Sequence, residues 1–107
     1  FKLDLISAIE KALDFSYKIE ILSGTVEELL KIRKEQQAKY QRAAKLVLDI
    51  ISKKEIPIME SEGNVDDFLT ELSKQGALIL TQDIELKKRL TKPYLTIRQK
   101  KKVILVK

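Results

Sequence analysis

The sequence predicts an α/β protein in which helices and strands alternate along the chain. Segments with a 3.6-residue apolar period are separated by short apolar segments of the strand type. The 107 residues are enough for one domain over residues 1–107 and too few for two ordinary cores. Because strands joined through helices usually pair in parallel, we expect three layers: a mostly parallel sheet of four to five strands with helices on both faces.

Five segments have the apolar spacing of amphipathic helices. The clearest is residues 38–53, where Ala44, Val47 and Ile51 lie on one predicted face together with Tyr40, which we interpret as a core or interface residue. Asp4 is suited to cap the first helix. The predicted helices are residues 4–14, 26–36, 38–53, 65–75 and 84–91.

Five short segments between or after these helices have strand character. Residues 17–22 alternate apolar and polar side chains, whereas residues 77–81 are almost continuously apolar, which is typical of a strand buried on both faces. Pro57 favours the start of a strand or a sheet edge. The predicted strands are residues 17–22, 56–59, 77–81, 94–98 and 103–106.

The composition excludes several classes of chemistry. The chain has no cysteine and no histidine, so it has no disulfide, no thiol nucleophile, no imidazole-based triad and no His-ligated metal centre. Its three glycines form no phosphate-binding loop. No apolar run is long enough to span a membrane and no signal-peptide pattern opens the chain, so we expect a cytoplasmic protein.

Positive charge gathers at the C-terminal end. Residues 84–107 contain nine Lys or Arg side chains and one acid, although the whole chain carries only +5. Such an end favours a polyanionic partner, most simply a nucleic acid. The alternative at this stage is a solvated charged surface without a partner.

Acidic residues recur where predicted strands turn into helices. Glu28, Asp66 and Asp83 each follow a predicted strand by a few residues. The carboxyl ends of parallel strands share one edge of a sheet, where ligands of α/β proteins bind. We therefore predict that these three carboxylates converge. Clustered carboxylates repel one another and suit Mg²⁺ or Mn²⁺, which prefer oxygen ligands and can activate water against a phosphodiester.

Each acid also has a purely structural interpretation. Thr25 and Glu28 have the spacing of a capping box, and Asn64 and Asp67 are spaced in the same way. Asp83 could cap the helix that follows it, and Asp66 in a first helical turn would complement the helix dipole. Only convergence on one site distinguishes the metal-binding interpretation from these roles.

Four segments resemble the motifs of PIN-domain nucleases. The apolar run and T-x-D motif within Gly76–Leu90 (GALILTQDIELKKRL) resemble the late strand-to-helix motif of that family. Val65–Leu69 (VDDFL) is similar to the preceding acidic motif, and Val26–Leu29 (VEEL) resembles an early E-L motif. Arg98–Lys102 (RQKKK) resembles the basic ending of archaeal PIN domains related to ribosomal-RNA processing factors.

The resemblance implies a PIN-like fold and a metal-dependent endoribonuclease, with a possible role in ribosomal-RNA processing. Glu28, Asp66 and Asp83 would hold Mg²⁺ or Mn²⁺, Thr81 would orient the site through its hydroxyl, and Asp67 is a weaker candidate ligand. The basic side chains would bind the phosphates of a structured or ribosomal RNA. These are Lys87, Lys88, Arg98, Lys100, Lys101 and Lys102.

The sequence departs from the family pattern at its start. PIN domains begin with a strand that carries a further metal-site Asp in a D-T-N-like motif, but the sequence opens at Phe1 and contains no D-T-N. We expect this strand upstream of Phe1. Two alternatives remain open: a non-catalytic RNA-binding scaffold on the same fold, and a VapC-type toxin ribonuclease. A homo-oligomer or a ribonucleoprotein partner is also possible.

Overall fold

The computed structural model describes residues 4–35, 37–99 and 101–107, which form an α/β protein of two compact units. The first unit comprises Phe1–Tyr17 and Asp66–Lys107, and the second comprises Lys18–Val65. No helix in the described ranges is both long and apolar enough to cross a membrane. In chain order the elements are α1 (Leu5–Ala12), β1 (Ile21–Leu22), α2 (Ser23–Glu35), α3 (Ala38–Lys53), β2 (Ile58–Met59), α4 (Val65–Lys74), α5 (Ile84–Arg89), β3 (Tyr94–Arg98) and β4 (Lys102–Val106).

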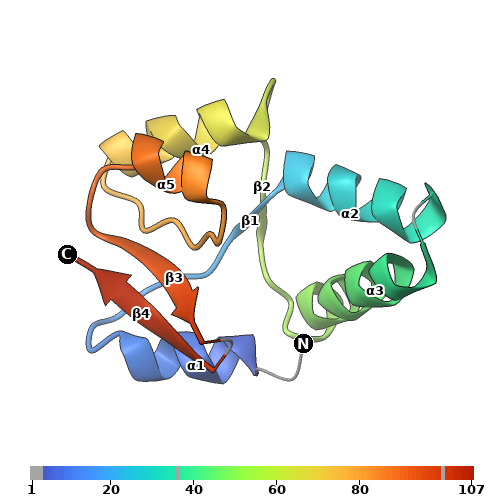
Figure 1. Ribbon diagram of the computed structural model, residues 1–107, viewed down its shortest axis with the longest axis horizontal. Helices are drawn as coiled ribbons and strands as arrows, with labels where there is room; N and C mark the ends of the chain where they lie inside the picture. The colour runs from blue at the N-terminus through green and yellow to red at the C-terminus, as the bar shows by residue number, and fades with distance from the viewer. Residues whose placement is uncertain (1–3, 36, 100) are drawn as a thin grey trace. The chain divides into compact units, whose positions relative to one another are not determined.

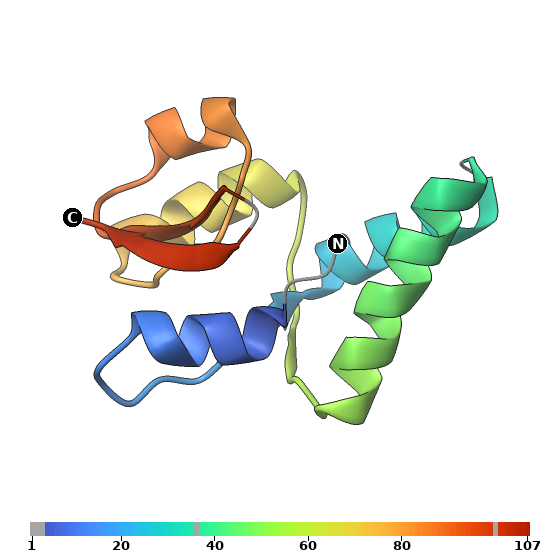
Figure 2. The same ribbon diagram turned by 60° about the horizontal axis from the view of Figure 1, so that its bottom comes forward.

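The first unit is built around the antiparallel hairpin of β3 and β4. Tyr94 pairs with Val106 at one end, and Arg98 pairs with Lys102 next to the turn, where Gln99 has a left-handed backbone with φ of 56°. The hairpin lies between α1 on one side and α4 with α5 on the other (Figures 1 and 2). This arrangement buries side chains from several elements of the unit. They include Ala8, Ile9, Ile79, Leu86, Leu95 and Val103.

The predicted strand 77–81 is reduced to one parallel bridge between Leu80 and Leu95. Its start belongs to the turn that ends α4, because the N–H of Ala77 still donates to the carbonyl of Leu72 at 3.1 Å. Gly76, with φ of +102°, supplies the left-handed residue of that turn. Ile79 is buried as predicted, whereas Ala77 is exposed. The segment is therefore too short for a regular strand.

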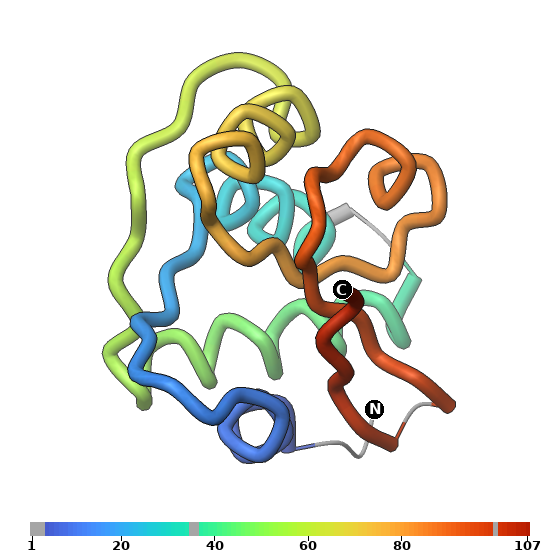
Figure 3. The backbone as a smooth tube through the Cα atoms, turned by 90° about the vertical axis from the view of Figure 1, so that its left-hand side faces the viewer, coloured from blue at the N-terminus to red at the C-terminus, as the bar shows by residue number. Residues whose placement is uncertain are grey.

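The second unit carries a parallel pair of strands and two helices. β1 and β2 run side by side, with Ile21 opposite Ile58 and Leu22 opposite Met59 (Figure 3). Both strands are shorter than the predicted 17–22 and 56–59. Pro57 has no N–H to extend the ladder, although its carbonyl accepts a bond of 3.0 Å from the N–H of Ile21.

The α2–α3 pair contains the most accurate helix prediction and one clear error. α3 spans Ala38–Lys53, as its apolar period predicts, and buries Ala44. Tyr40 and Val47, on the same predicted face, are 48% and 39% exposed. The ammonium group of Lys39 lies 5.0 Å from the centre of the Tyr40 ring. Tyr40 is therefore not a core residue, and its interpretation as an interface residue stays a prediction.

The prediction of one mostly parallel sheet of four to five strands is wrong for the described residues. They form a two-stranded parallel sheet and a two-stranded antiparallel sheet. The last predicted strand follows β3 after a tight turn rather than a helix, so β4 runs antiparallel. That residues 1–107 form a single domain stays a prediction.

Candidate functional site

The turn Thr81–Asp83 joins the parallel bridge to α5. The N–H of Thr81 donates to the carbonyl of Leu95 at 3.1 Å, which ties the start of the turn to β3. The N–H of Asp83 then donates to the hydroxyl of Thr81 at 3.1 Å. The Thr81 hydroxyl thus contacts the backbone of Asp83, and its role at a metal site stays a prediction.

The side chain of Asp83 caps α5. Its Oδ1 atom accepts bonds from the N–H groups of Glu85 at 2.8 Å and Leu86 at 3.1 Å, so the structural role predicted for Asp83 is confirmed. Within the part of the chain that the structure describes, no donor contacts its Oδ2 atom. The cap uses one carboxylate oxygen and fixes the side chain, leaving the second oxygen for a ligand.

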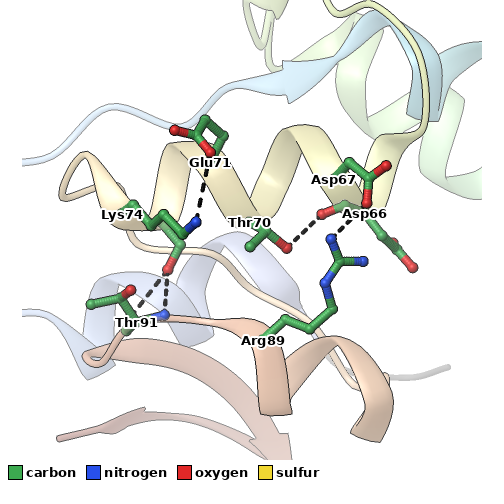
Figure 4. Close-up of polar contacts among 8 residues, drawn as sticks. Asp66, Asp67, Thr70, Glu71, Lys74, Arg89 and Thr91 are labelled. Carbon is green, nitrogen blue, oxygen red and sulfur yellow. Dashed lines mark hydrogen bonds and ion pairs between the residues drawn. The ribbon is translucent and has the colours of Figure 1, made fainter.

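Asp66 and Asp67 occupy the first turn of α4 and have different surroundings. The carbonyl of Asp66 accepts a bond of 2.7 Å from the Thr70 hydroxyl, and the residue is half-buried. Asp67 is exposed, and its Oδ1 atom lies 2.6 Å from the guanidinium Nη2 of Arg89 at the end of α5. Figure 4 shows Arg89 reaching toward Asp67. Asp67 already has a cationic partner, which makes it a poorer candidate metal ligand than Asp66.

Glu28 lies on α2 in the second unit and is exposed. The predicted capping box is wrong, because α2 begins at Ser23 and places Thr25 inside the helix. The helix start is instead held by Ser61. The Ser61 N–H donates to the Ser23 hydroxyl, and the Gly24 N–H donates to the Ser61 hydroxyl, both at 2.9 Å. Glu28 is consequently not needed as a cap.

Asp66 and Asp83 begin neighbouring helices of the first unit. Besides the Asp67–Arg89 ion pair, the loop after α5 is held to α4 through Ser73, which is 3% exposed. The Ser73 hydroxyl donates to the carbonyl of Thr91 at 3.1 Å and accepts from its N–H at 2.8 Å. In the described ranges no group of three or more acidic side chains forms a metal site. Convergence of Glu28 with Asp66 and Asp83 stays a prediction.

The basic candidates lie on α5 and around the β3–β4 turn. Lys88 forms an exposed ion pair of 3.4 Å with Glu85, and Lys87 is half-buried. Arg98, Lys101 and Lys102 are exposed at the turn. Lys100 lies outside the described residues. Three cationic side chains thus surround one tight turn, which suits contact with phosphate groups.

Two hydrogen-bonded pairs that hold helix ends could not be predicted from the sequence. Ser23 and Ser61 are 38 residues apart, and Ser73 and Thr91 are 18 apart. Serine is common both in loops and on helices, so neither residue stands out by type. The only local signal is the small pair Ser23-Gly24, which directly follows the predicted strand 17–22. A Cβ atom at Gly24 would lie 2.8 Å from Cγ2 of Val65 and 3.0 Å from the Ser61 hydroxyl, so a larger residue at this position would force these side chains to shift.

A comparison with protein families matches residues 1–100 to the PIN-like domain. No curated protein matches the chain, and no solved structure does. PIN domains are generally nucleases and generally use divalent metal ions. The match extends over nearly all of the sequence and includes all four motifs, except the last two residues of the basic ending. The chain therefore belongs to the PIN-like domain family.

Proposed function

We propose that this protein is a metal-dependent endoribonuclease of the PIN type, acting on structured RNA such as ribosomal RNA. The observation that carries the proposal is the geometry of Asp83. Its Oδ1 atom is fixed by two backbone N–H groups, and its Oδ2 atom has no partner among the described residues. A side chain held in this way is prepared to bind a cation without a further loss of conformational freedom.

The candidate donors suit Mg²⁺ or Mn²⁺. Glu28, Asp66 and Asp83 offer only carboxylate oxygens, the ligands that these hard cations prefer. When bound, such a cation supplies an activated water and stabilises negative charge on a phosphodiester.

The remaining residues would bind and orient the RNA. Arg98, Lys101 and Lys102 are exposed around one turn and would contact phosphates without reading the base sequence. Lys87 and Lys88 on α5, and Lys100, are further candidates for phosphate contact. Each phosphate neutralised on single-stranded RNA contributes a slope of about −0.7 to the dependence of log K on log salt concentration. We therefore expect RNA affinity to fall steeply as salt rises.

The test is RNA cleavage by the variants Asp66→Asn and Asp83→Asn in Mn²⁺. Asparagine keeps a side-chain oxygen that can cap a helix but removes the charge that a metal needs. We expect each variant to lose Mn²⁺-dependent cleavage and to retain RNA affinity, measured by fluorescence anisotropy in EDTA. Asp14→Asn is the matched control, since Asp14 is exposed and outside every helix. Cleavage by the Asp66→Asn/Asp83→Asn double variant at the wild-type rate would contradict the proposal.

One observation favours a second function, a non-catalytic RNA-binding scaffold. Among the described residues, no three acidic side chains lie close enough together to hold a metal ion, whereas exposed basic side chains are present around the β3–β4 turn. In that case reversal of Arg98, Lys101 and Lys102 to Glu should abolish RNA binding, and added metal should change nothing. Mn²⁺-dependent cleavage by the wild-type protein would reject the scaffold function.

A further inference from the structure

The side chain of Gln82 ties the Thr81–Asp83 turn to β3. Its Oε1 atom accepts a bond of 2.8 Å from the Thr96 hydroxyl and one of 3.1 Å from the Ile97 N–H. Thr96 is buried, with 7% of its surface exposed. Gln82 stands between Thr81 and Asp83, so its two bonds act on the same three-residue turn whose other contacts are described above.

The bond from the Ile97 N–H adds one hydrogen bond to the edge of β3 that pairs with Ile79 and Thr81. The N–H of Leu95 donates to the carbonyl of Ile79 at 2.8 Å, and Ile97, two residues later, presents its N–H to the same edge of β3. There the Gln82 carboxamide takes the place of a backbone carbonyl. The main chain is thereby released from the bridge at Thr81 and can turn into Asp83 and α5.

The buried Thr96 hydroxyl donates to residue 82, so the side chain at that position has to contain a hydrogen-bond acceptor. A buried hydroxyl without a partner is unfavourable, and Gln82 is the hydrogen-bond partner of this one within the described ranges. A glutamate could keep both bonds, since its carboxylate accepts in the same place. A methionine has a similar length but no comparable acceptor, so it would leave both donors of β3 unmatched.

We propose that Gln82 is a positioning residue that sets the orientation of the Asp83 carboxylate for metal binding. The inference rests on the proposed function, because it assigns to Gln82 an effect on a ligand of that site. Gln82 itself is not assigned any contact with metal or RNA. Loss of partners that orient metal ligands commonly weakens metal affinity about 10- to 100-fold.

The experiment measures Mn²⁺ binding by the 107-residue protein without RNA, through the EPR signal of free Mn²⁺. We expect Gln82→Met to weaken Mn²⁺ binding by about 10-fold or more and Gln82→Glu to retain it. Gln75→Met is the matched control, because Gln75 is exposed at the end of α4. In a second readout, amide hydrogen exchange at Leu86 should be faster in Gln82→Met, since Asp83 would hold that N–H less firmly.

The double variant Gln82→Met/Thr96→Val separates positioning from stability. Valine removes the unmatched buried hydroxyl, so the free energy of unfolding should recover relative to Gln82→Met alone, whereas Mn²⁺ binding should stay weak. Recovery of both the free energy of unfolding and Mn²⁺ binding in the double variant would overturn the positioning role. Unchanged Mn²⁺ binding and unchanged Leu86 exchange in Gln82→Met would overturn it as well. Absence of Mn²⁺ binding by the wild-type protein would instead overturn the proposed function, and this inference with it.

Discussion

The starts of α5 and α2 differ, although both follow a strand-like segment and contain a threonine and an acid. At α5 the acid Asp83 is the N-cap, and its carboxylate binds the backbone two and three residues later. At α2 the helix begins at Ser23, before Thr25, and the bonds at its start come from Ser61. One helix start is stabilised locally and the other by a residue distant in the sequence.

Because of this difference, the side chains of Asp83 and Glu28 differ in conformational freedom. Asp83 is fixed by its cap, whereas Glu28 is an exposed residue within α2 and makes no cap there. A carboxylate with a structural role is already oriented before it meets a cation. Glu28 would have to be ordered by the metal itself, which costs side-chain entropy. Substitutions at the two helix starts and at the Asp67–Arg89 ion pair test this contrast.

Asp83→Ala should give the largest loss of stability. Replacement of an N-cap Asp by Ala costs about 1 kcal/mol, up to about 2, because the first N–H groups of the helix lose their acceptor. Urea denaturation measures the change in the free energy of unfolding. Asp83→Asn should leave that quantity nearly unchanged, and a loss in Asn as large as in Ala would mean that the charge, rather than the cap, stabilises α5.

Ser61→Ala should destabilise the start of α2 by about 1 kcal/mol, the usual net value of a hydrogen bond in a partly buried place. The variant leaves the Gly24 N–H without its acceptor. Ser16→Ala, at an exposed position outside the helices, is the matched control for the same measurement. Equal stabilities of the two variants would show that Ser61 does not hold α2.

The Asp67–Arg89 ion pair should contribute less. Its side chains are 68% and 45% exposed, and exposed pairs are worth about 0.2–1 kcal/mol. A double-mutant cycle with Asp67→Asn and Arg89→Gln gives the coupling energy, which should fall as salt screens the charges. A coupling that is insensitive to salt would argue against a simple ion pair between α4 and α5.

Thr25→Ala should have the smallest effect, within about 0.5 kcal/mol, because Ala is a better helix former than Thr at a position inside a helix. If Thr25 were an N-cap, the same change would cost about 1 kcal/mol. Thermal unfolding followed by circular dichroism distinguishes the two values. A clear destabilisation would restore the capping box with Glu28.

Prediction from sequence succeeded where the stabilising contacts are local. The apolar period of residues 38–53 predicted both ends of α3, and the Asp83 cap could be predicted because donor and acceptor lie within three residues. Asp4 likewise caps α1 through the N–H of Ser7. In each case the sequence itself contains both partners at a fixed short spacing.

Prediction failed where tertiary contacts decide. Residues 77–81 have the composition of a buried strand, but the turn after α4 and the turn into α5 leave room for only one bridge. The start of α2 depends on Ser61, and the orientation of the Thr81–Asp83 turn depends on β3. No local pattern identifies such partners, so the start of α2 and the hydrogen bonds of Gln82 became visible only in the structure.

The function proposed above requires that Glu28, Asp66 and Asp83 hold one divalent cation. Paramagnetic broadening of backbone amide signals by substoichiometric Mn²⁺ tests it directly, because the effect falls steeply with distance from the bound ion. We expect signals at Glu28, Asp66 and Asp83 to broaden together and Asp83→Asn to abolish all three effects. Broadening at Asp66 and Asp83 without Glu28, or at none of them, would contradict it.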